Sequence, residues 1–328
     1  MADFWFGKRV LITGGTGFIG SWLVKSLIKN GSKVTLLVRD LHPNVFFSLK
    51  QNQLFPKNIV IGDLSNYDLV TRIFNEYEIE ACFHLAAQAI VGVANQSPLS
   101  TFTSNIKGTW NLLEAARNSK TLDRMIVASS DKAYGEPIEV PIPESHPLLA
   151  SHPYDASKAC EEILAKTYYH SYGLPIAISR CSNIYGGGDL NFSRIIPDII
   201  RSILLDKQPI IRSDGKSIRE YLYISDVISG YLSLGKNLSQ KNVKGEAFNF
   251  GASNPISVIE LVNKLLRITE KNNLKPKIMN KTSNEIKIQY LSSKKAKNIL
   301  NWYPKTSLDD GLKQTFEWYR DNLNLWSS

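Results

Sequence analysis

A glycine-rich loop between a strand and a helix, close to the start of the chain, constrains the fold more than any other feature of the sequence. Lys8–Thr13 is a short apolar run with β-branched residues, and Phe18–Lys29 carries apolar residues at helical spacing. Asn30–Gly31 follows as a typical C-terminal helix cap. The loop Thr13–Gly20 (TGGTGFIG) joins the two. A strand, a glycine turn and a helix in this order are typical of parallel sheets covered by helices.

The glycines of this loop have distinct predicted roles. Gly14 allows a sharp turn, Gly17 lets a pyrophosphate approach the backbone, and Gly20 permits close packing of the helix on the strand. The free N–H groups and positive dipole at the helix N-terminus favour phosphate. The spacing Gly-x-x-Gly-x-x-Gly differs from the Gly-x-Gly-x-x-Gly of ordinary dehydrogenases. The loop predicts a dinucleotide site, with a purely structural turn as the alternative.

Strands and helices alternate through the first half of the chain. The further predicted strands are Lys33–Val38, Asn58–Gly62, Ala81–Leu85, Arg124–Ser129 and Leu174–Cys181. The further predicted helices are Asn66–Tyr77, Leu99–Arg117 and Tyr154–Tyr172. Strands this apolar predict a parallel sheet that is buried on both faces. The expected fold class is α/β, with a Rossmann-type doubly wound parallel sheet.

The alternation changes after Tyr185, where three glycines follow one another. Beyond them we predict helices at 194–205 and 225–234, a short strand at 209–212, and a strand at 247–250 that returns to the first sheet. We therefore expect a Rossmann domain at 1–185 plus about 222–251. Residues 186–221 and 252–328 are expected to form a smaller C-terminal α/β lobe that binds substrate.

Charge and cysteine content exclude several classes of protein. The formal net charge is +9, but no basic run is longer than Lys294–Lys295, so we predict no nucleic-acid partner. No apolar run approaches the ~20 residues that cross a bilayer, and the N-terminus lacks an apolar signal core. Cys82, Cys160 and Cys181 are widely spaced, without a metal-ligand pattern. We predict free thiols, no metal, no membrane partner and a cytoplasmic location.

The end of the second predicted strand bears on the type of dinucleotide. An acidic residue there would bind the ribose hydroxyls of NAD and repel the 2′-phosphate of NADP. Val38 occupies that position, and Arg39 can pair with a phosphate, which favours NADP. Asp40 can still reach the ribose, so NAD stays open. Asp63, after the third strand, is predicted to lie beside the adenine.

Tyr154 and Lys158 are four residues apart, on one face of a predicted helix. A nearby ammonium lowers the pKa of a phenol, so that Tyr154 can act as a base near neutral pH. Tyr290 and Lys294 have the same spacing, but a surface helix start is the more ordinary interpretation there. Tyr154 differs because it follows Ser129–Lys132, at the end of a parallel strand, where such sheets bind ligands.

These motifs carry a family resemblance. The chain resembles the extended short-chain dehydrogenases/reductases, in the NAD(P)-dependent nucleotide-sugar epimerase/dehydratase family, nearly end to end. The matching segments are TGGTGFIG, Gly62–Leu64, His84–Ala87, Asn105–Thr109, Ser130–Gly135, Tyr154 with Lys158, Arg180–Gly186, Arg219–Tyr221 and Asn301–Pro304. The resemblance implies a nucleotide-diphosphate sugar as substrate and a homodimer through the helices near 99–117 and 154–172.

The resemblance also implies roles for individual residues. The implied catalytic residues are Ser130, Asp131, Lys132, Tyr154 and Lys158. The implied cofactor-binding residues are Gly14, Thr16, Gly17, Phe18, Ile19, Arg39, Asp63, Leu64, Leu85, Ala86 and Ala87, with Tyr154 and Lys158. The implied substrate-binding residues are Gln88, Ser130, Asn183, Arg194 and Arg219. One departure is that relatives carry a further phosphate-binding arginine near Thr282–Glu285, where this chain has none.

Asp131–Lys132 bears on the reaction. Epimerases of this family commonly carry small or apolar residues there, whereas Asp-Glu is typical of dTDP-glucose dehydratases and Asp-Lys resembles CDP-glucose 4,6-dehydratases. The resemblance implies transient oxidation at C4, water elimination across C5 and C6 with Asp131 as acid, and hydride return to C6. The C5 base stays open, since Lys132 can serve only if it is neutral. The alternatives are a simple Asp131–Lys132 pair in a 4-epimerase, and a non-catalytic cofactor-binding protein.

Overall fold

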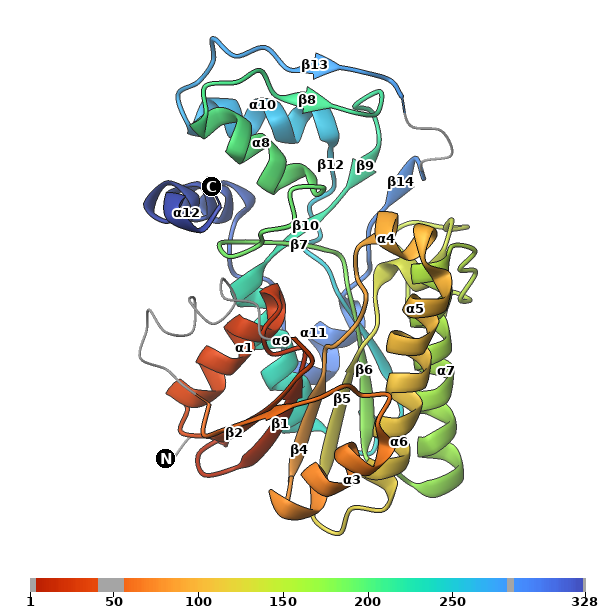
Figure 1. The fold of residues 1–328 in the computed structure, drawn as a ribbon. Helices are drawn as coiled ribbons and strands as arrows, with labels where there is room; N and C mark the ends of the chain where they lie inside the picture. Colours follow the sequence, from red (N-terminus) through yellow and green to blue (C-terminus); the bar gives the residue numbers. More distant parts are fainter. Residues whose placement is uncertain (1–3, 41–55, 282–285, 327–328) are drawn as a thin grey trace.

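A seven-stranded parallel sheet forms the centre of the computed structural model, which describes residues 4–40, 56–281 and 286–326 (Figure 1). Its strands are β1 (Arg9–Thr13), β2 (Lys33–Val38), β3 (Asn58–Ile61), β4 (Ala81–His84), β5 (Arg124–Ala128), β6 (Ile176–Cys181) and β11 (Ala247–Phe250). Their order is β11-β6-β5-β4-β1-β2-β3, and every neighbouring pair is parallel. The predicted Rossmann-type fold and the return of 247–250 to the sheet are confirmed.

Helices cover both faces of this sheet, as Figure 1 shows. One face carries α3 (Tyr67–Glu76), α6 (Gly108–Arg117) and α7 (Pro153–Tyr172), and the other carries α1 (Phe18–Lys29), α9 (Ile224–Asn237) and α11 (Lys294–Leu300). Adjacent strand residues point to opposite faces, so Leu11 packs with the first group and Ile12 with the second. Strands buried on both faces explain the unbroken apolar runs in the sequence.

The second part of the chain lies beyond the carboxyl ends of the strands (Figure 1). Its elements are β7 (Asn183–Tyr185), α8 (Ile195–Leu204), β8 (Ile210–Ile211), β9 (Ile218–Arg219), β10 (Tyr221–Tyr223), β12 (Ile256–Ser257), α10 (Val258–Ile268), β13 (Lys277–Ile278), β14 (Ile288–Gln289), α12 (Leu308–Asp321) and η3 (Leu323–Leu325). The pairing of β7 with β10 and the order β12-β9-β14 were not predicted. The domain boundaries stay a prediction.

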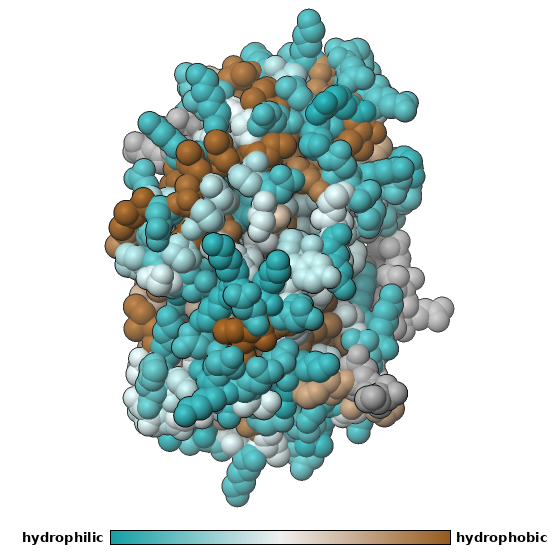
Figure 2. Space-filling model, turned by 180° about the vertical axis from the view of Figure 1, so that it is seen from behind, coloured by the Kyte–Doolittle hydropathy of each residue, from teal (hydrophilic) through white to brown (hydrophobic). Residues whose placement is uncertain are grey.

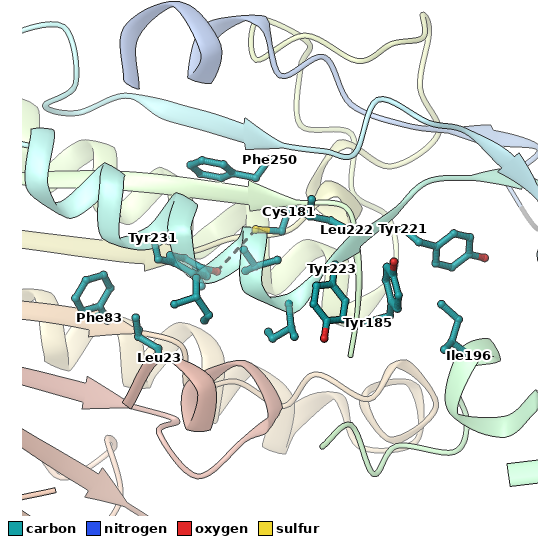
Figure 3. Packing of buried hydrophobic residues seen from close by; sticks show 14 of the residues in the cluster. Leu23, Phe83, Cys181, Tyr185, Ile196, Tyr221, Leu222, Tyr223, Tyr231 and Phe250 are labelled. Carbon is teal, nitrogen blue, oxygen red and sulfur yellow. Dashed lines mark hydrogen bonds between the residues drawn. The ribbon is translucent and has the colours of Figure 1, made fainter. Parts of the chain in front are cut away.

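One apolar cluster joins the two parts, and Figure 3 shows its centre. Leu23 and Phe83 belong to the sheet side, Tyr185 and Tyr223 lie on the β7–β10 pair, and Ile196 comes from α8. Because all five side chains are buried in one cluster, the second part packs on the sheet through a common core. The outer surface seen from behind is mostly hydrophilic, with apolar residues in separate patches (Figure 2).

The segment predicted as one helix over 99–117 is interrupted. The structure has α5 (Pro98–Phe102), a π-helical turn at Thr103–Lys107 and then α6, and the short α4 (Val91–Gln96) precedes them. The turn contains the buried Asn105, whose amide donates to Ser157 Oγ at 2.8 Å and accepts from the Gln88 N–H at 2.7 Å. A polar side chain that must reach these two partners accounts for the extra residue in the turn.

Helix α7 begins and ends with clear signals in the sequence. Pro153 occupies its first turn, and Gly173 follows in the left-handed conformation with φ +70°.

Within the described ranges, no helix is long and apolar enough to cross a membrane. Cys82, Cys160 and Cys181 are free thiols; Cys82 and Cys181 are buried, as expected, whereas Cys160 is half-buried.

Candidate active site

A cavity of about 1020 Å³ lies at the carboxyl ends of the parallel strands, between the sheet and the second part of the chain. Ligands of doubly wound sheets bind at this end. Every predicted site residue except Gln88 lines the cavity. The Gln88 side-chain carbonyl instead accepts a hydrogen bond from the Ile90 N–H at 3.2 Å. The predicted cofactor, catalytic and substrate residues, which are far apart in the sequence, therefore share one space.

The glycine loop has the geometry that a pyrophosphate requires. Gly14 has φ +71°, and a Cβ there would lie 2.6 Å from the Ala86 nitrogen. A Cβ at Gly20 would clash with the carbonyl oxygen of Gly14, which confirms its predicted packing role. Helix α1 begins after Gly17, and no side chain in the described ranges caps it. Its first N–H groups are available to an anion, so this loop fits a dinucleotide phosphate.

Three charged residues line the far end of the cavity, where β2 and β3 end. Arg39 Nε contacts Asp40 Oδ2 at 2.6 Å, and both side chains are exposed. Asp63 Oδ1 accepts from the Ser65 N–H at 2.7 Å. Burial raises the pKa of Asp63, but the Ser65 hydrogen bonds and the Arg39 charge outweigh it and hold the pKa below its usual value.

Tyr154 and Lys158 lie in the first turns of α7, beside the end of β5. Lys158 Nζ donates to the Ala128 carbonyl at 2.8 Å and to Glu161 Oε2 at 2.9 Å. The predicted lowering of the Tyr154 pKa is wrong in its net direction. Burial raises this pKa, the Lys158 charge and a Ser130 hydrogen bond lower it, and Glu161 raises it again, so that the pKa lies above its usual value.

Sequence reasoning missed Glu161, which is fully buried beneath the Tyr154–Lys158 pair. The sequence feature that could have identified Glu161 is its position three residues after Lys158, on the same face of the helix. Burial raises the pKa of Glu161 to about 7, and Lys158 opposes that rise. Burial lowers the pKa of Lys158, but Glu161 and Tyr154 together outweigh burial and the net shift is upward. The two groups thus stabilise each other's charged forms.

Asp131 and Lys132 form a second charged group on the cavity wall, on the 3₁₀ turn η2 (Asp131–Tyr134). Lys132 Nζ lies 3.1 Å from Asp131 Oδ2, and Ser130 Oγ donates to Asp131 Oδ1 at 3.1 Å. The sequence did not indicate Gln289 of β14, whose Oε1 accepts from Lys132 Nζ at 2.6 Å. The Gln289 amide also donates to the Asp131 carbonyl at 3.1 Å.

A third carboxyl, Asp155, is buried next to Tyr154 on α7. Burial raises the pKa of Asp155 to about 6, the charges of Lys132 and His152 lower it, and Asp131 raises it. Asp155 does not line the cavity, but the charges of Asp131 and Lys132 act on it.

The opposite wall of the cavity carries the predicted substrate residues. Asn183 Nδ2 donates to the Glu220 carbonyl at 3.2 Å, and Arg194 Nη1 contacts Asp189 Oδ2 at 2.9 Å. The Arg219 guanidinium donates to the Ile218 carbonyl at 2.8 Å, and it also donates to the Ile286 carbonyl. These bonds hold two guanidinium groups at the cavity wall, which suits a diphosphate. The segment Thr282–Glu285, where the sequence lacks an arginine, lies outside the described residues.

The described ranges contain no group of three or more His, Cys, Asp or Glu side chains that could hold a metal ion. The cavity wall instead carries the hydroxyls of Ser130 and Tyr154 together with two ammonium groups, Lys132 and Lys158, each paired with a carboxyl. Such pairs can move protons between neighbouring atoms.

Comparison with known proteins identifies relatives over the whole chain. A family model described as GDP-mannose 4,6 dehydratase matches residues 11–315. The chain is 30% identical to a CDP-glucose 4,6-dehydratase of Salmonella typhimurium, over 97% of this chain and 92% of that protein. It is 32% identical to a UDP-glucuronate 4-epimerase of Thermodesulfobacterium geofontis, over 97% of this chain and 98% of that protein.

A solved structure has the same fold as this chain. The dTDP-glucose 4,6-dehydratase of Bacillus anthracis, in complex with NAD, superimposes with a TM-score of 0.87 at 26% sequence identity. The superposition covers 98% of this chain and 99% of that one.

Proposed function

Because this chain belongs to the GDP-mannose 4,6 dehydratase family of nucleotide-sugar dehydratases and epimerases, we propose that it is a nucleotide-sugar 4,6-dehydratase. Its proposed substrate is an NDP-hexose resembling CDP-glucose, and its product is the 4-keto-6-deoxy sugar. The observation that carries this proposal is the Asp131–Lys132 pair, which lines the same cavity as Ser130 and Tyr154. An epimerase needs no acid–base pair for C5 and C6.

The first half of the proposed reaction uses Ser130, Tyr154 and Lys158. The glycine loop and the start of α1 would hold a nicotinamide dinucleotide, which would supply reversible hydride transfer at the sugar. Tyr154 removes the C4 hydroxyl proton, with Ser130 hydrogen-bonded beside it. The Lys158 charge stabilises the phenolate that Tyr154 forms.

The second half uses the Asp131–Lys132 pair. The 4-ketone acidifies the C5 proton, and removing that proton while the C6 hydroxyl leaves requires a base and an acid. Asp131 is the proposed acid for the leaving C6 hydroxyl, and Lys132 lies 3.1 Å from its carboxyl. The base that takes the C5 proton stays open, since Lys132 can serve only in its neutral form.

The direct test is loss of water from a nucleotide sugar. Purified protein is incubated separately with CDP-, dTDP-, UDP- and GDP-glucose, and with GDP-mannose, and the products are weighed by mass spectrometry. We expect a product lighter by one water with CDP-glucose in preference to the others. A product of unchanged mass with inverted C4 would contradict the dehydratase and support the epimerase.

One observation favours the 4-epimerase as the second candidate. Asp131 and Lys132 already bond to each other and to Gln289, as a purely structural pair would. The relative from Thermodesulfobacterium geofontis is an epimerase of similar identity. Ser130, Tyr154 and Lys158 would then do all the chemistry.

The proposed cofactor is a nicotinamide dinucleotide. NADP over NAD stays a prediction, based on Arg39 at the adenosine end of the cavity. The Arg39–Asp40 pair is exposed, so that releasing Arg39 to a phosphate costs little. The solved relative from Bacillus anthracis is a complex with NAD, and Asp40 can serve the ribose hydroxyls that NAD exposes. Cytoplasmic location also stays a prediction.

We further propose a homodimer through the helices near 99–117 and 154–172. Large apolar side chains are exposed on three helices that pack together, namely Leu99 (80% exposed) on α5, Trp110 (56%) on α6 and Ile163 (57%) on α7. Monomers rarely leave several such side chains in one region in water. A second copy of the chain, offering the same helices, would cover them symmetrically.

Placing a charge among these side chains is expected to separate the subunits. Trp110→Asp and Ile163→Asp should each shift the protein from dimer to monomer in sedimentation velocity at micromolar concentration, because an unpaired charge would be buried. Ile278→Asp on β13 is the matched control, since Ile278 is 49% exposed in the other part of the chain. The Ile278→Asp variant should sediment with the mass of the wild-type dimer. Dimers that persist in both helix variants would contradict this interface.

A further inference from the structure

The carboxyl of Glu161 is unusual because it is fully buried and has only one hydrogen-bond partner among the described residues. Its Oε2 accepts from Lys158 Nζ at 2.9 Å, while its Oε1 is buried without such a partner in the same part of the chain. The neighbouring Glu162 differs, since its oxygens contact both Arg180 and Lys166. A buried carboxylate is costly when half of it is unpaired. Glutamate at this position therefore calls for an explanation other than stability.

Lys158 connects this carboxyl to the reacting groups. An ammonium has three N–H donors, and the Ala128 carbonyl and Glu161 take two of them. The Lys158 side chain lines the cavity beside Tyr154. Glu161 and the Ala128 carbonyl thus fix the position of the Lys158 ammonium. The electrostatic effect on Tyr154 is therefore that of the Lys158–Glu161 pair and not of Lys158 alone.

We propose that Glu161 is a positioning residue that fixes the Lys158 ammonium and sets the proton affinity of Tyr154. This proposal rests on the proposed function insofar as Tyr154 is the base at C4. An ionised Glu161 offsets part of the Lys158 charge, so Tyr154 holds its proton more tightly. A neutral Glu161 leaves the ammonium uncompensated, and the phenolate becomes easier to form.

Burial supports this coupling because it raises the pKa of Glu161 to about 7, which places its change of charge near neutral pH. Three other titratable groups near the pair keep the same charge around neutral pH. His84 on β4 stays neutral, since burial and Lys158 lower its pKa to about 3. Burial raises the pKa values of Cys181 on β6 and Tyr231 on α9 well above neutral.

The remaining charged neighbours are Asp131 on η2, which raises the pKa of Tyr154 together with Glu161, and Asp155 on α7, whose own pKa is raised by burial to about 6. Asp131 has Lys132 at 3.1 Å, so its charge is compensated within its own pair. Lys158 donates to Glu161, whereas the charges that act on Asp155 are those of Lys132, His152 and Asp131. Glu161 is therefore the carboxyl whose charge change acts on Tyr154 through Lys158.

Titration of Tyr154 itself tests the proposal without substrate. The holoenzyme is labelled with ¹³C at the tyrosine ζ carbons, and the Tyr154 signal is assigned by its absence in Tyr154→Phe. Glu161→Gln keeps the size of the side chain and removes its charge. We expect the Tyr154 pKa to fall by about one unit or more, a tenfold change in its acid dissociation constant. If the Glu161→Gln variant does not fold, Glu161→Met carries the same test.

Glu162→Gln is the matched control, because it removes a buried carboxylate from the same helix that contacts Arg180 instead of Lys158. It should leave the Tyr154 pKa unchanged even if it lowers the melting temperature. A Tyr154 pKa that is the same in folded Glu161→Gln and wild type would overturn the proposal. Because no nucleotide sugar is needed, this result is independent of which sugar, or which reaction, the enzyme uses.

Discussion

Replacing Tyr154 with phenylalanine is expected to reduce turnover by about 10³-fold or more, while the bound dinucleotide is retained. The phenol is the group proposed to take the C4 proton, and losing a general base costs about 10²–10⁴-fold. Phenylalanine fills nearly the same volume, so the start of α7 should keep its packing. The measurement is product formation by mass spectrometry, with the cofactor content of the purified variant determined in parallel.

Tyr290→Phe is the matched control for this change. Tyr290 and Lys294 have the same spacing as Tyr154 and Lys158, but neither lines the cavity. Turnover should stay within about twofold of wild type in this variant. A Tyr154→Phe enzyme with a tenth of the wild-type rate would show that another group is the base.

Asp131→Asn should separate oxidation from dehydration. The substitution keeps the shape of the side chain but removes the acid for the C6 hydroxyl, at a cost of about 10²–10⁴-fold in water loss. Ser130, Tyr154 and Lys158 are untouched, so C4 oxidation should continue. With nucleotide sugar deuterated at C4, we expect deuterium on the cofactor and little dehydrated product.

Two outcomes of this experiment would contradict the dehydratase. Unchanged water loss would show that Asp131 is only a structural partner of Lys132. Inversion at C4 without water loss, in wild type and variant alike, would identify an epimerase. The melting temperature of the variant must be compared with wild type, because Asp131→Asn also breaks an ion pair whose carboxylate is buried.

The sheet, and the residues that line the cavity, could be predicted because their signals are local. The strand–loop–helix order and three glycines define the phosphate turn, and Tyr154 and Lys158 lie about one helical turn from each other. Parallel strands end at one edge, so residues that follow different strands must meet there. This is why Asp63, Ala86 and Ser130 line one cavity although they are far apart in sequence.

The features that were missed depend on distant contacts or on net electrostatics. Gln289 accepts a hydrogen bond from Lys132, which is 157 residues away in the sequence. Nothing in the sequence around Gln289 indicates that this polar side chain is buried. The π-helical turn follows from the partners of Asn105, which belong to other segments. The Tyr154 pKa was predicted in the wrong direction because the sequence shows Lys158 as a neighbour but not the depth of burial or the opposing Glu161.

The Gln289 contact makes the two halves of the proposed chemistry separable by mutation. The proposed hydride exchange at C4 uses groups carried by the large sheet and α7, whereas Lys132 donates a hydrogen bond to β14, which is only two residues long. A substitution in that short strand can alter the acid–base pair without disturbing the sheet. Substitutions in β14 could therefore convert an enzyme that eliminates water into one that only inverts a carbon, without changing the dinucleotide site.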